Sequence, residues 1–170
     1  MALPHFKKQT NTVTSIAYET PTWLWDKLNK IYNFYTDPCT FSTNPLKTPL
    51  FFTEEDNGLD YTKWKGNTYI NPPYFREDLE AWTDQAALYS LLNQERTIVM
   101  LVPVKTEQFW FQNLLGRIML NIKFYFIKGR LRFAGTHHSA TFSSMLVIFN
   151  DKVFDTNGCK IIESNVFDKD

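Results

Sequence analysis

Residues 68–74 read Thr-Tyr-Ile-Asn-Pro-Pro-Tyr, and this stretch decides the fold that we expect for the chain. Its first three residues have the composition of a β-strand. The strand must end after Ile70, because the two prolines that follow the asparagine lack the backbone N–H groups of a ladder. Apolar spacing then predicts a helix over 77–92. Residues 71–74 are therefore expected at the carboxyl end of a strand, where parallel sheets bind ligands.

Helices and strands alternate along the rest of the chain. Thr20-Pro21 is typical of a helix start, and apolar residues follow it at spacings of four and three. The near-continuous apolar run at 97–102 predicts a strand buried on both faces. The whole pattern predicts helices over 22–31, 77–92 and 107–115, strands over 34–36, 68–70, 97–102, 119–127 and 144–149, and a loop over 39–49. This order is typical of an α/β domain with a mixed, mostly parallel sheet.

The composition bounds the class of protein. With 170 residues, 44% of them hydrophobic, the chain can fill one core. We expect a single domain over 18–150, a polar N-terminal arm over 1–17 that needs a partner or the domain to order it, and a C-terminal extension of the same domain over 151–170. The 18 basic and 18 acidic residues balance, which argues against bulk neutralisation of a polyanion.

Membrane, secretory and metal-binding classes are disfavoured. No apolar stretch reaches the roughly 20 residues of a membrane span, and no signal pattern opens the chain, so we expect a cytoplasmic protein without a membrane partner. Cys39 and Cys159 are 120 positions apart and lack the spacing of metal ligands. Neither a disulfide framework nor a metal site is therefore expected.

The side chains of residues 71–74 suit one kind of chemistry. An exocyclic amino group on a nucleobase is a poor nucleophile, because its lone pair is delocalised into the ring. Two acceptors aimed at its N–H bonds favour a tetrahedral nitrogen and stabilise the charge that develops there. Asn71 Oδ1 and the Pro72 carbonyl can be those acceptors, Pro73 stiffens the backbone, and Tyr74 offers a flat face for a base turned out of its helix. The alternative is a loop whose prolines only end the strand.

Asn71 to Tyr74 resembles the (Asp/Asn/Ser)-Pro-Pro-(Tyr/Phe/Trp) motif of amino-group methyltransferases that use S-adenosylmethionine. From about Tyr18 to Phe149 the chain is similar to phage-type, Dam-like DNA N6-adenine methyltransferases. The segments that recur in the order of that family are Thr20-Pro21 before a helix with Trp23 and Trp25, Asp37-Pro38-Cys39, Phe51-Phe52-Thr53, Asp56-Asn57-Gly58-Leu59, Trp64, Val99 to Pro103, Trp110-Phe111, Gly129 to Phe133, and Ser139-Ala140 with Phe142.

The resemblance implies a Rossmann-like fold and a reaction. A single methyltransferase domain would transfer a methyl group from S-adenosylmethionine to N6 of a flipped adenine in DNA. The protein would be phage or prophage encoded and act in the host cytoplasm. No metal is required, because the sulfonium of the cofactor supplies its own leaving group.

The resemblance also implies where the cofactor binds. It puts Glu19-Thr20-Pro21 near the methionine end, and the N–H groups at a helix start independently favour a carboxylate there. It puts Asp37 of Asp37-Pro38-Cys39 at the ammonium group, with Asn71 bordering the same site. The Gly-x-Gly turn that usually follows this acid is absent, so a tight glycine loop is not available.

A further acid should accept hydrogen bonds from the ribose hydroxyls of the cofactor. Glu54, Glu55 and Asp56 are the candidates. Asp56 is favoured because it adjoins the Asn57-Gly58 turn. A solvated acidic turn is the alternative for each of them.

Basic residues gather in the second half of the chain. From Gly116 to His138 there are five lysines and arginines and no acidic residue. An extended backbone at 129–133 puts Arg130 and Arg132 on one face, which suits contacts with DNA phosphates. A solvated surface is the alternative. The other candidates for DNA contacts are Phe75, Arg76, Lys105 and the pair His137-His138.

Other functions share parts of this pattern. Asn-Pro-Pro-Tyr also occurs in methyltransferases of a glutamine amide in release factors (glutamine-N5) and of guanine-N2 in ribosomal RNA, which typically carry the Gly-rich loop. Cytosine-N4 enzymes generally have Ser in place of Asn71. A catalytically silent nucleic-acid-binding module would keep the fold without binding a cofactor. The sequence does not specify the recognition site or the oligomeric state.

Overall fold

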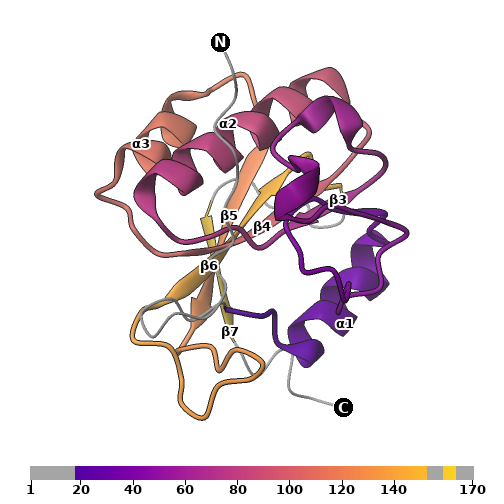
Figure 1. Cartoon of the computed structure of the whole chain (residues 1–170). Coiled ribbons are helices and arrows are strands. Elements are labelled where there is room, and N and C mark those ends of the chain that lie inside the picture. Colours follow the sequence, from indigo (N-terminus) through magenta and orange to yellow (C-terminus); the bar gives the residue numbers. More distant parts are fainter. Residues whose placement is uncertain (1–17, 153–158, 164–170) are drawn as a thin grey trace.

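The computed structural model describes residues 18–152 and 159–163, which form three layers with a sheet in the middle. Figure 1 shows α2 and α3 together on one side of this sheet and α1 on the other. The helices are α1 (Thr22–Tyr32), α2 (Arg76–Leu92) and α3 (Phe109–Gly116), with the short 3-10 helices η1 (Glu54–Asp56) and η2 (Tyr61–Lys63). The strands are β1 (Thr36–Asp37), β2 (Leu50–Phe51), β3 (Thr68–Ile70), β4 (Ile98–Pro103), β5 (Ile122–Lys128), β6 (Ser144–Phe149) and β7 (Cys159–Glu163).

The described strands form one seven-stranded sheet in the order β2-β1-β3-β4-β6-β5-β7. Four of the pairings are parallel, and β6 is antiparallel to both of its neighbours. The sheet is therefore mixed and mostly parallel, which confirms the predicted α/β class. The carboxyl ends of β1, β3, β4 and β5 consequently lie along one edge of the sheet, and the loops that follow these strands meet there.

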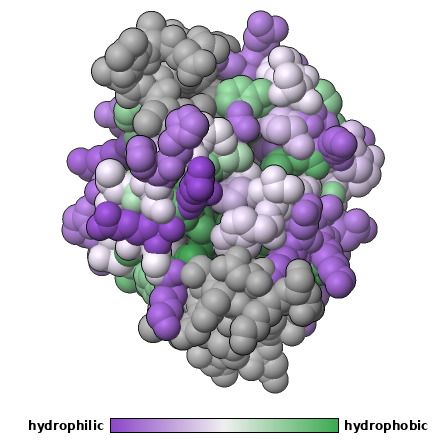
Figure 2. Space-filling model, turned by 90° about the horizontal axis from the view of Figure 1, so that it is seen from below, coloured by the Kyte–Doolittle hydropathy of each residue, from purple (hydrophilic) through white to green (hydrophobic). Residues whose placement is uncertain are grey.

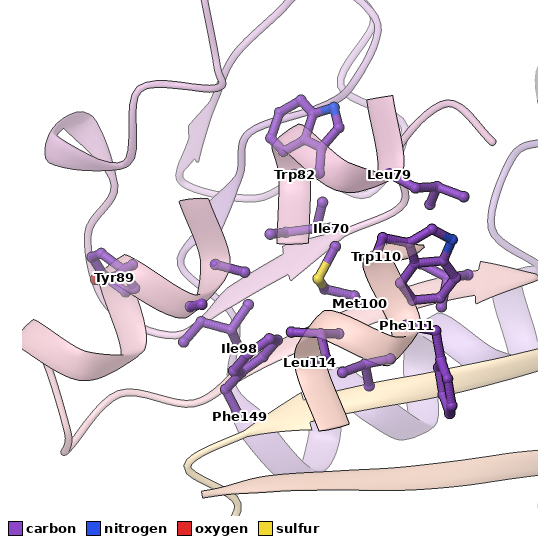
Figure 3. Packing of buried hydrophobic residues seen from close by; sticks show 14 of the residues in the cluster. Ile70, Leu79, Trp82, Tyr89, Ile98, Met100, Trp110, Phe111, Leu114 and Phe149 are labelled. Atoms are coloured by element: carbon purple, nitrogen blue, oxygen red, sulfur yellow. The ribbon is translucent and has the colours of Figure 1, made fainter. Parts of the chain in front are cut away.

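Successive residues of the central strand face opposite layers. Met100 packs towards α2 and α3 in a cluster with Trp82 and Trp110, which Figure 3 shows from close by. Val99 packs towards α1 in a second cluster that contains Leu24. All residues of β4 are buried, because a helical layer covers each face of the strand. This double cover is the reason why the strand reads as an uninterrupted apolar run.

The predicted elements are present with small shifts. The strands Thr68–Ile70 and Ser144–Phe149 have the predicted bounds, and the three helices begin and end within two residues of expectation. The strand predicted over 34–36 is displaced to Thr36–Asp37. Its first residues instead close the preceding helix, since the N–H of Phe34 donates to Asn29 Oδ1 at 2.9 Å.

Two strands were not predicted. β2 has two residues, lies directly after the loop expected over 39–49 and is defined by its parallel pairing with β1. β7 pairs with β5 and lies within the predicted C-terminal extension, of which the structure describes 151–152 and 159–163. The predicted arm over 1–17 lies outside the described residues.

A buried polar cluster fixes the carboxyl end of α1. Asp151, just after β6, accepts hydrogen bonds from the hydroxyls of Tyr32 at 3.2 Å and Tyr125 at 2.8 Å. Burial and the Asp151 carboxylate raise the pKa of Tyr32 above its ordinary value. Because Tyr32 ends α1, these bonds hold that end against the sheet, and the start of α1 is directed to the carboxyl edge.

Candidate active site

A pocket of about 320 Å³, including its open mouth, lies at the carboxyl ends of β1 and β3. Asp37 ends β1 and Asn71 follows β3, its parallel neighbour, so both residues reach the same edge. Figure 2 is viewed from the side of this edge and shows hydrophobic surface, in green, recessed between hydrophilic side chains. The residues that line the pocket are Glu19, Thr20, Asp37, Cys39, Thr40, Phe41, Pro45, Leu46 and Asn71. Five of them are among the residues predicted for the cofactor.

The Asp37-Pro38-Cys39 turn is held from two sides. The N–H of Cys39 donates to Asp37 Oδ1 at 3.2 Å, a local bond that aspartate often makes in turns. Gly58 packs directly on the Pro38 carbonyl, since a Cβ added to Gly58 would lie 1.8 Å from that oxygen. The carbonyl of Gly58 in turn accepts a hydrogen bond of 2.8 Å from the indole of Trp64. Asp37, a residue that is 3% exposed, is thereby fixed at the pocket.

The loop after β1 keeps its shape without the missing glycines. Asn44 adopts a left-handed backbone with φ 44°, a conformation that asparagine tolerates better than most residues. Its side chain also closes the loop, because Nδ2 donates to the carbonyl of Thr48 at 3.0 Å and Oδ1 accepts from the Thr48 N–H at 3.3 Å. Phe41, Pro45 and Leu46 are thereby held along the pocket as an apolar wall.

Hydrogen bonds at both ends orient the amide of Asn71. Its Nδ2 donates to the carbonyl of Tyr18 at 2.6 Å and to Thr20 Oγ1 at 3.2 Å. Thr20 Oγ1 lies 2.9 Å from the hydroxyl of Tyr69, with which it shares a further hydrogen bond. Asn71 Oδ1 accepts from the hydroxyl of Tyr74 at 2.8 Å. An amide oxygen has two lone pairs, so this atom can still accept from a second donor.

The two tyrosine hydroxyls of this network remain protonated. Burial raises the pKa of Tyr69 and of Tyr74 above the ordinary value, because the charged form loses its water. A protonated hydroxyl is the form of Tyr74 that donates to Asn71 Oδ1. The orientation of the amide is therefore kept across neutral and mildly alkaline pH.

The loop over 129–143, which follows β5, lies over the same edge. The N–H of Ala134 donates to the carbonyl of Glu19 at 3.0 Å and forms an isolated antiparallel bridge. Burial alternates along this segment. Arg130 and Arg132 are exposed, and the residue that follows each of them, Leu131 or Phe133, is buried. The alternation matches the prediction for an extended segment and directs both guanidinium groups to the surface.

Aromatic rings join this loop to the Asn-Pro-Pro-Tyr segment. The ring of Tyr74 lies 5.6 Å from Phe142 and 6.3 Å from Phe133, centroid to centroid. Tyr18 contacts all three of these rings. The edge of the sheet therefore carries an apolar aromatic cluster directly beside the polar network of Asn71.

The structure puts the favoured ribose acid outside the pocket lining. Asp56 is exposed in η1, and its Oδ2 accepts from the N–H and the hydroxyl of Thr53 at 2.8 and 2.7 Å. These hydrogen bonds, the backbone one first, lower the pKa of Asp56. Glu54 and Glu55 belong to the same short helix and do not line the pocket either.

The remaining predicted DNA contacts lie close to the carboxyl ends of β3 and β4. Phe75 is 54% exposed directly after the Asn-Pro-Pro-Tyr segment. Arg76 opens α2 and pairs with Glu80 at 3.1 Å, an exposed ion pair. Lys105 follows β4 and is half-buried. None of the three belongs to the pocket lining.

Several residues of the site were missed from sequence. Tyr69 carried a usable signal, because alternation in a strand puts it on the face opposite to Ile70, and Thr20 lies just before the helix that covers that face. Phe41, Pro45 and Leu46 carried none, since a loop without periodicity does not indicate which of its side chains turn inward. Tyr18 was taken only as the start of the folded chain.

Comparison with known proteins agrees with this arrangement. The model of the family described as DNA N-6-adenine-methyltransferase (Dam) matches residues 7–164, nearly the whole chain. No match is found among the curated proteins.

Within the described part of the chain, no group of three or more His, Cys, Asp and Glu side chains could hold a metal ion. Over the same residues, no helix combines the length and the apolar character needed to cross a membrane.

The contact of Gly58 with Pro38 can be tested by substitution. Gly58→Ala should lower the free energy of unfolding by about 1–3 kcal/mol, because the added methyl group displaces the turn that carries Asp37. Urea unfolding measures this loss. Gly116→Ala is the matched control, since nothing lies within 4 Å of its added Cβ, and its stability should be unchanged or slightly higher. Wild-type stability of Gly58→Ala would contradict the close packing.

Proposed function

The chain belongs to the DNA N-6-adenine-methyltransferase family, and we propose that it transfers the methyl group of S-adenosylmethionine to N6 of adenine in DNA through the residues of the pocket edge. The observation that carries this proposal is the oriented amide of Asn71. Its nitrogen is engaged by the Tyr18 carbonyl, so its oxygen is directed away from that carbonyl and accepts hydrogen bonds. The family supports a DNA substrate. A phage or prophage origin and the host cytoplasm as the compartment are part of the proposal.

The proposed cofactor site is the pocket between β1 and β3. Asp37 would hold the ammonium group, because its carboxylate is buried at the pocket and supported by the Cys39 N–H. Glu19-Thr20-Pro21 would meet the methionine carboxylate at the start of α1. Phe41 and Leu46 supply an apolar wall suited to the flat adenine of the cofactor. Asp56 stays the proposed ribose acid and would have to reach the cofactor from outside the pocket lining.

The proposed mechanism rests on acceptors. When bound, S-adenosylmethionine supplies an electrophilic methyl group on sulfur. Asn71 Oδ1 and the Pro72 carbonyl would accept hydrogen bonds from the two N–H groups of the target amino group. The lone pair of the amino nitrogen then leaves conjugation with the ring. Pro73 limits backbone movement. The two hydrogen bonds strengthen as positive charge develops on the nitrogen, and that difference between ground and transition state is what accelerates transfer.

The reaction is tested on DNA from cells that express the protein. We expect N6-methyldeoxyadenosine above background by mass spectrometry of nucleosides. Asn71→Ala should reduce kcat by on the order of 10²-fold, because it removes an acceptor of the transition state. Cofactor affinity should fall far less, since Thr20 keeps its contact with the Tyr69 hydroxyl and Glu19 keeps its bridge to Ala134.

The control for that variant is Asn67→Ala, which also removes a hydrogen-bonded amide, here a partly buried one at the amino end of β3, and should not act selectively on kcat. Methylated glutamine in protein or methylguanine in RNA would favour one of the rival methyltransferases. No methylation of any kind would favour a silent binding module. Wild-type turnover of Asn71→Ala would remove this residue from the mechanism.

The cofactor site is tested through the charge of Asp37. Asp37→Asn keeps the size of the side chain and an oxygen for the Cys39 N–H but removes the negative charge. We expect S-adenosylmethionine to bind more weakly by roughly 1.5–3 kcal/mol in calorimetry, the range for a hydrogen bond to a charged group. Asp26→Asn, on the exposed side of α1, is the control and should bind normally. Normal binding by Asp37→Asn would exclude this site for the ammonium group.

The proposed DNA surface is tested through its salt dependence. Arg130→Ala with Arg132→Ala should weaken DNA binding across sequences and reduce the slope of log K against log salt by about 2, since two phosphate contacts are lost. Cofactor affinity should not change. Lys65→Ala with Arg96→Ala removes the same charge at the opposite edge of the sheet, just before β3 and β4, and should leave the slope unchanged. An unchanged slope in the arginine variant would make this loop ordinary solvated surface, while Phe75, Arg76 and Lys105 would remain to be tested.

A further inference from the structure

The ring of Tyr18 lies inside a box formed by three other aromatic rings. It stacks on Tyr74 at a centroid distance of 5.4 Å and an interplanar angle of 17°. It meets Phe142 edge-on at 5.1 Å and Phe133 at 4.8 Å. The three surrounding rings are farther from one another, at 5.6 to 6.3 Å. Tyr18 is therefore the inserted ring and the other three are the walls.

Tyr18 is anchored by its backbone rather than by its side chain. Its carbonyl accepts the 2.6 Å hydrogen bond from Asn71 Nδ2, and the next residue is held by the bridge from Glu19 to Ala134. Among the described residues, its hydroxyl has no hydrogen-bond partner, and the contacts that these residues make with the ring are aromatic. Rotation about the Cα–Cβ bond of Tyr18 can therefore move its ring out of the box while its carbonyl keeps the hydrogen bond from Asn71.

We propose that Tyr18 occupies the binding site of the target base and is displaced by it, an inference that rests on the proposed function. A nucleobase is a flat aromatic ring, and the Tyr74 face that suits it is the face that Tyr18 covers. The hydroxyl of Tyr74 donates a hydrogen bond to Asn71 Oδ1, so a base stacked on Tyr74 lies next to the atom that would accept from its amino group. The Tyr18 ring thus keeps the apolar box filled until adenine replaces it.

This arrangement links the base site to the cofactor site. Glu19 and Thr20, which directly follow Tyr18, line the pocket proposed for S-adenosylmethionine. A ligand held there fixes the backbone on which Tyr18 is carried. Exchange of the ring for a base then needs a change of one side chain and leaves the orientation of Asn71 intact.

The exchange predicts that removal of the ring makes base capture easier. The probe is a single-stranded oligonucleotide with 2-aminopurine at one position, whose fluorescence reports stacking without methyl transfer or duplex opening. Tyr18→Ala should bind it at least about fivefold more tightly than wild type, because the base no longer competes with a stacked ring. Tyr18→Phe keeps the ring and should bind like wild type. An oligonucleotide with an abasic residue at that position should bind all three proteins equally.

The opposite result is equally informative. Weaker binding by Tyr18→Ala would make Tyr18 a wall of the base site, and equal binding would make its ring unrelated to the base; either outcome overturns the inference. Should Tyr18→Ala fail to fold, wild-type protein labelled with 3-fluorotyrosine gives a second measurement. Its Tyr18 signal, assigned with Tyr18→Phe, should shift with the 2-aminopurine oligonucleotide and not with the abasic one. No shift would again overturn the inference.

Failure of this inference is separable from failure of the proposed function. The 2-aminopurine measurement needs no methyl transfer, whereas the nucleoside measurement needs no displacement of Tyr18. DNA methylation by wild type together with unaltered probe binding by Tyr18→Ala would retain the enzyme and discard the exchange. Tighter probe binding without any DNA methylation would retain the exchange for a nucleic-acid base and discard the reaction.

Discussion

The hydrogen bond from Asn71 Nδ2 to the carbonyl of Tyr18, 2.6 Å long, is the contact on which the rest of the site depends. It joins the end of β3 to the segment before α1, two parts of the chain separated by 53 positions. Because an amide that donates at one end must present its oxygen at the other, this single bond decides which atom of Asn71 can accept. It also holds Glu19 and Thr20 beside the pocket.

The direction of the strands determines what can gather around that contact. With β6 as the reversed strand, β1, β3, β4 and β5 all deliver their following loops to one edge. The loop after β1 brings an acid, the loop after β3 brings the amide, and the loop over 129–143 brings two exposed arginines and two aromatic rings. A chain with no net charge thereby acquires an edge where an acidic pocket adjoins a basic loop.

Backbone requirements in this edge are met by unusual residues. The turn at Asp37 needs a glycine, but the glycine comes from position 58, where any side chain would collide with the Pro38 carbonyl. The loop after the acid, where a Gly-x-Gly turn is the common solution, instead uses Asn44 in a left-handed conformation and closes itself with the asparagine side chain. The loop after β1 therefore keeps its shape through the hydrogen bonds of an asparagine side chain, without a glycine turn.

Much of this protein could be predicted from sequence, because the deciding interactions are local. Two prolines end β3 wherever the strand lies, apolar spacing defines α1 and α2, and the alternation around Arg130 separates exposed from buried side chains. The family was recognised on the same local grounds, since Asn71 to Tyr74 and Asp37 to Cys39 are contiguous in the chain. The α/β class followed from the order of these elements.

Other features were decided by the tertiary structure. The strand near residue 34 begins late because Asn29 takes the N–H of Phe34, and Asp56 faces its own turn because Thr53 satisfies its carboxylate. The apolar wall of the pocket and the insertion of Tyr18 among three rings depend on segments far apart in sequence. Such contacts form only when the sheet has brought its loops together, and no local pattern of residues encodes the partner that a side chain will meet there.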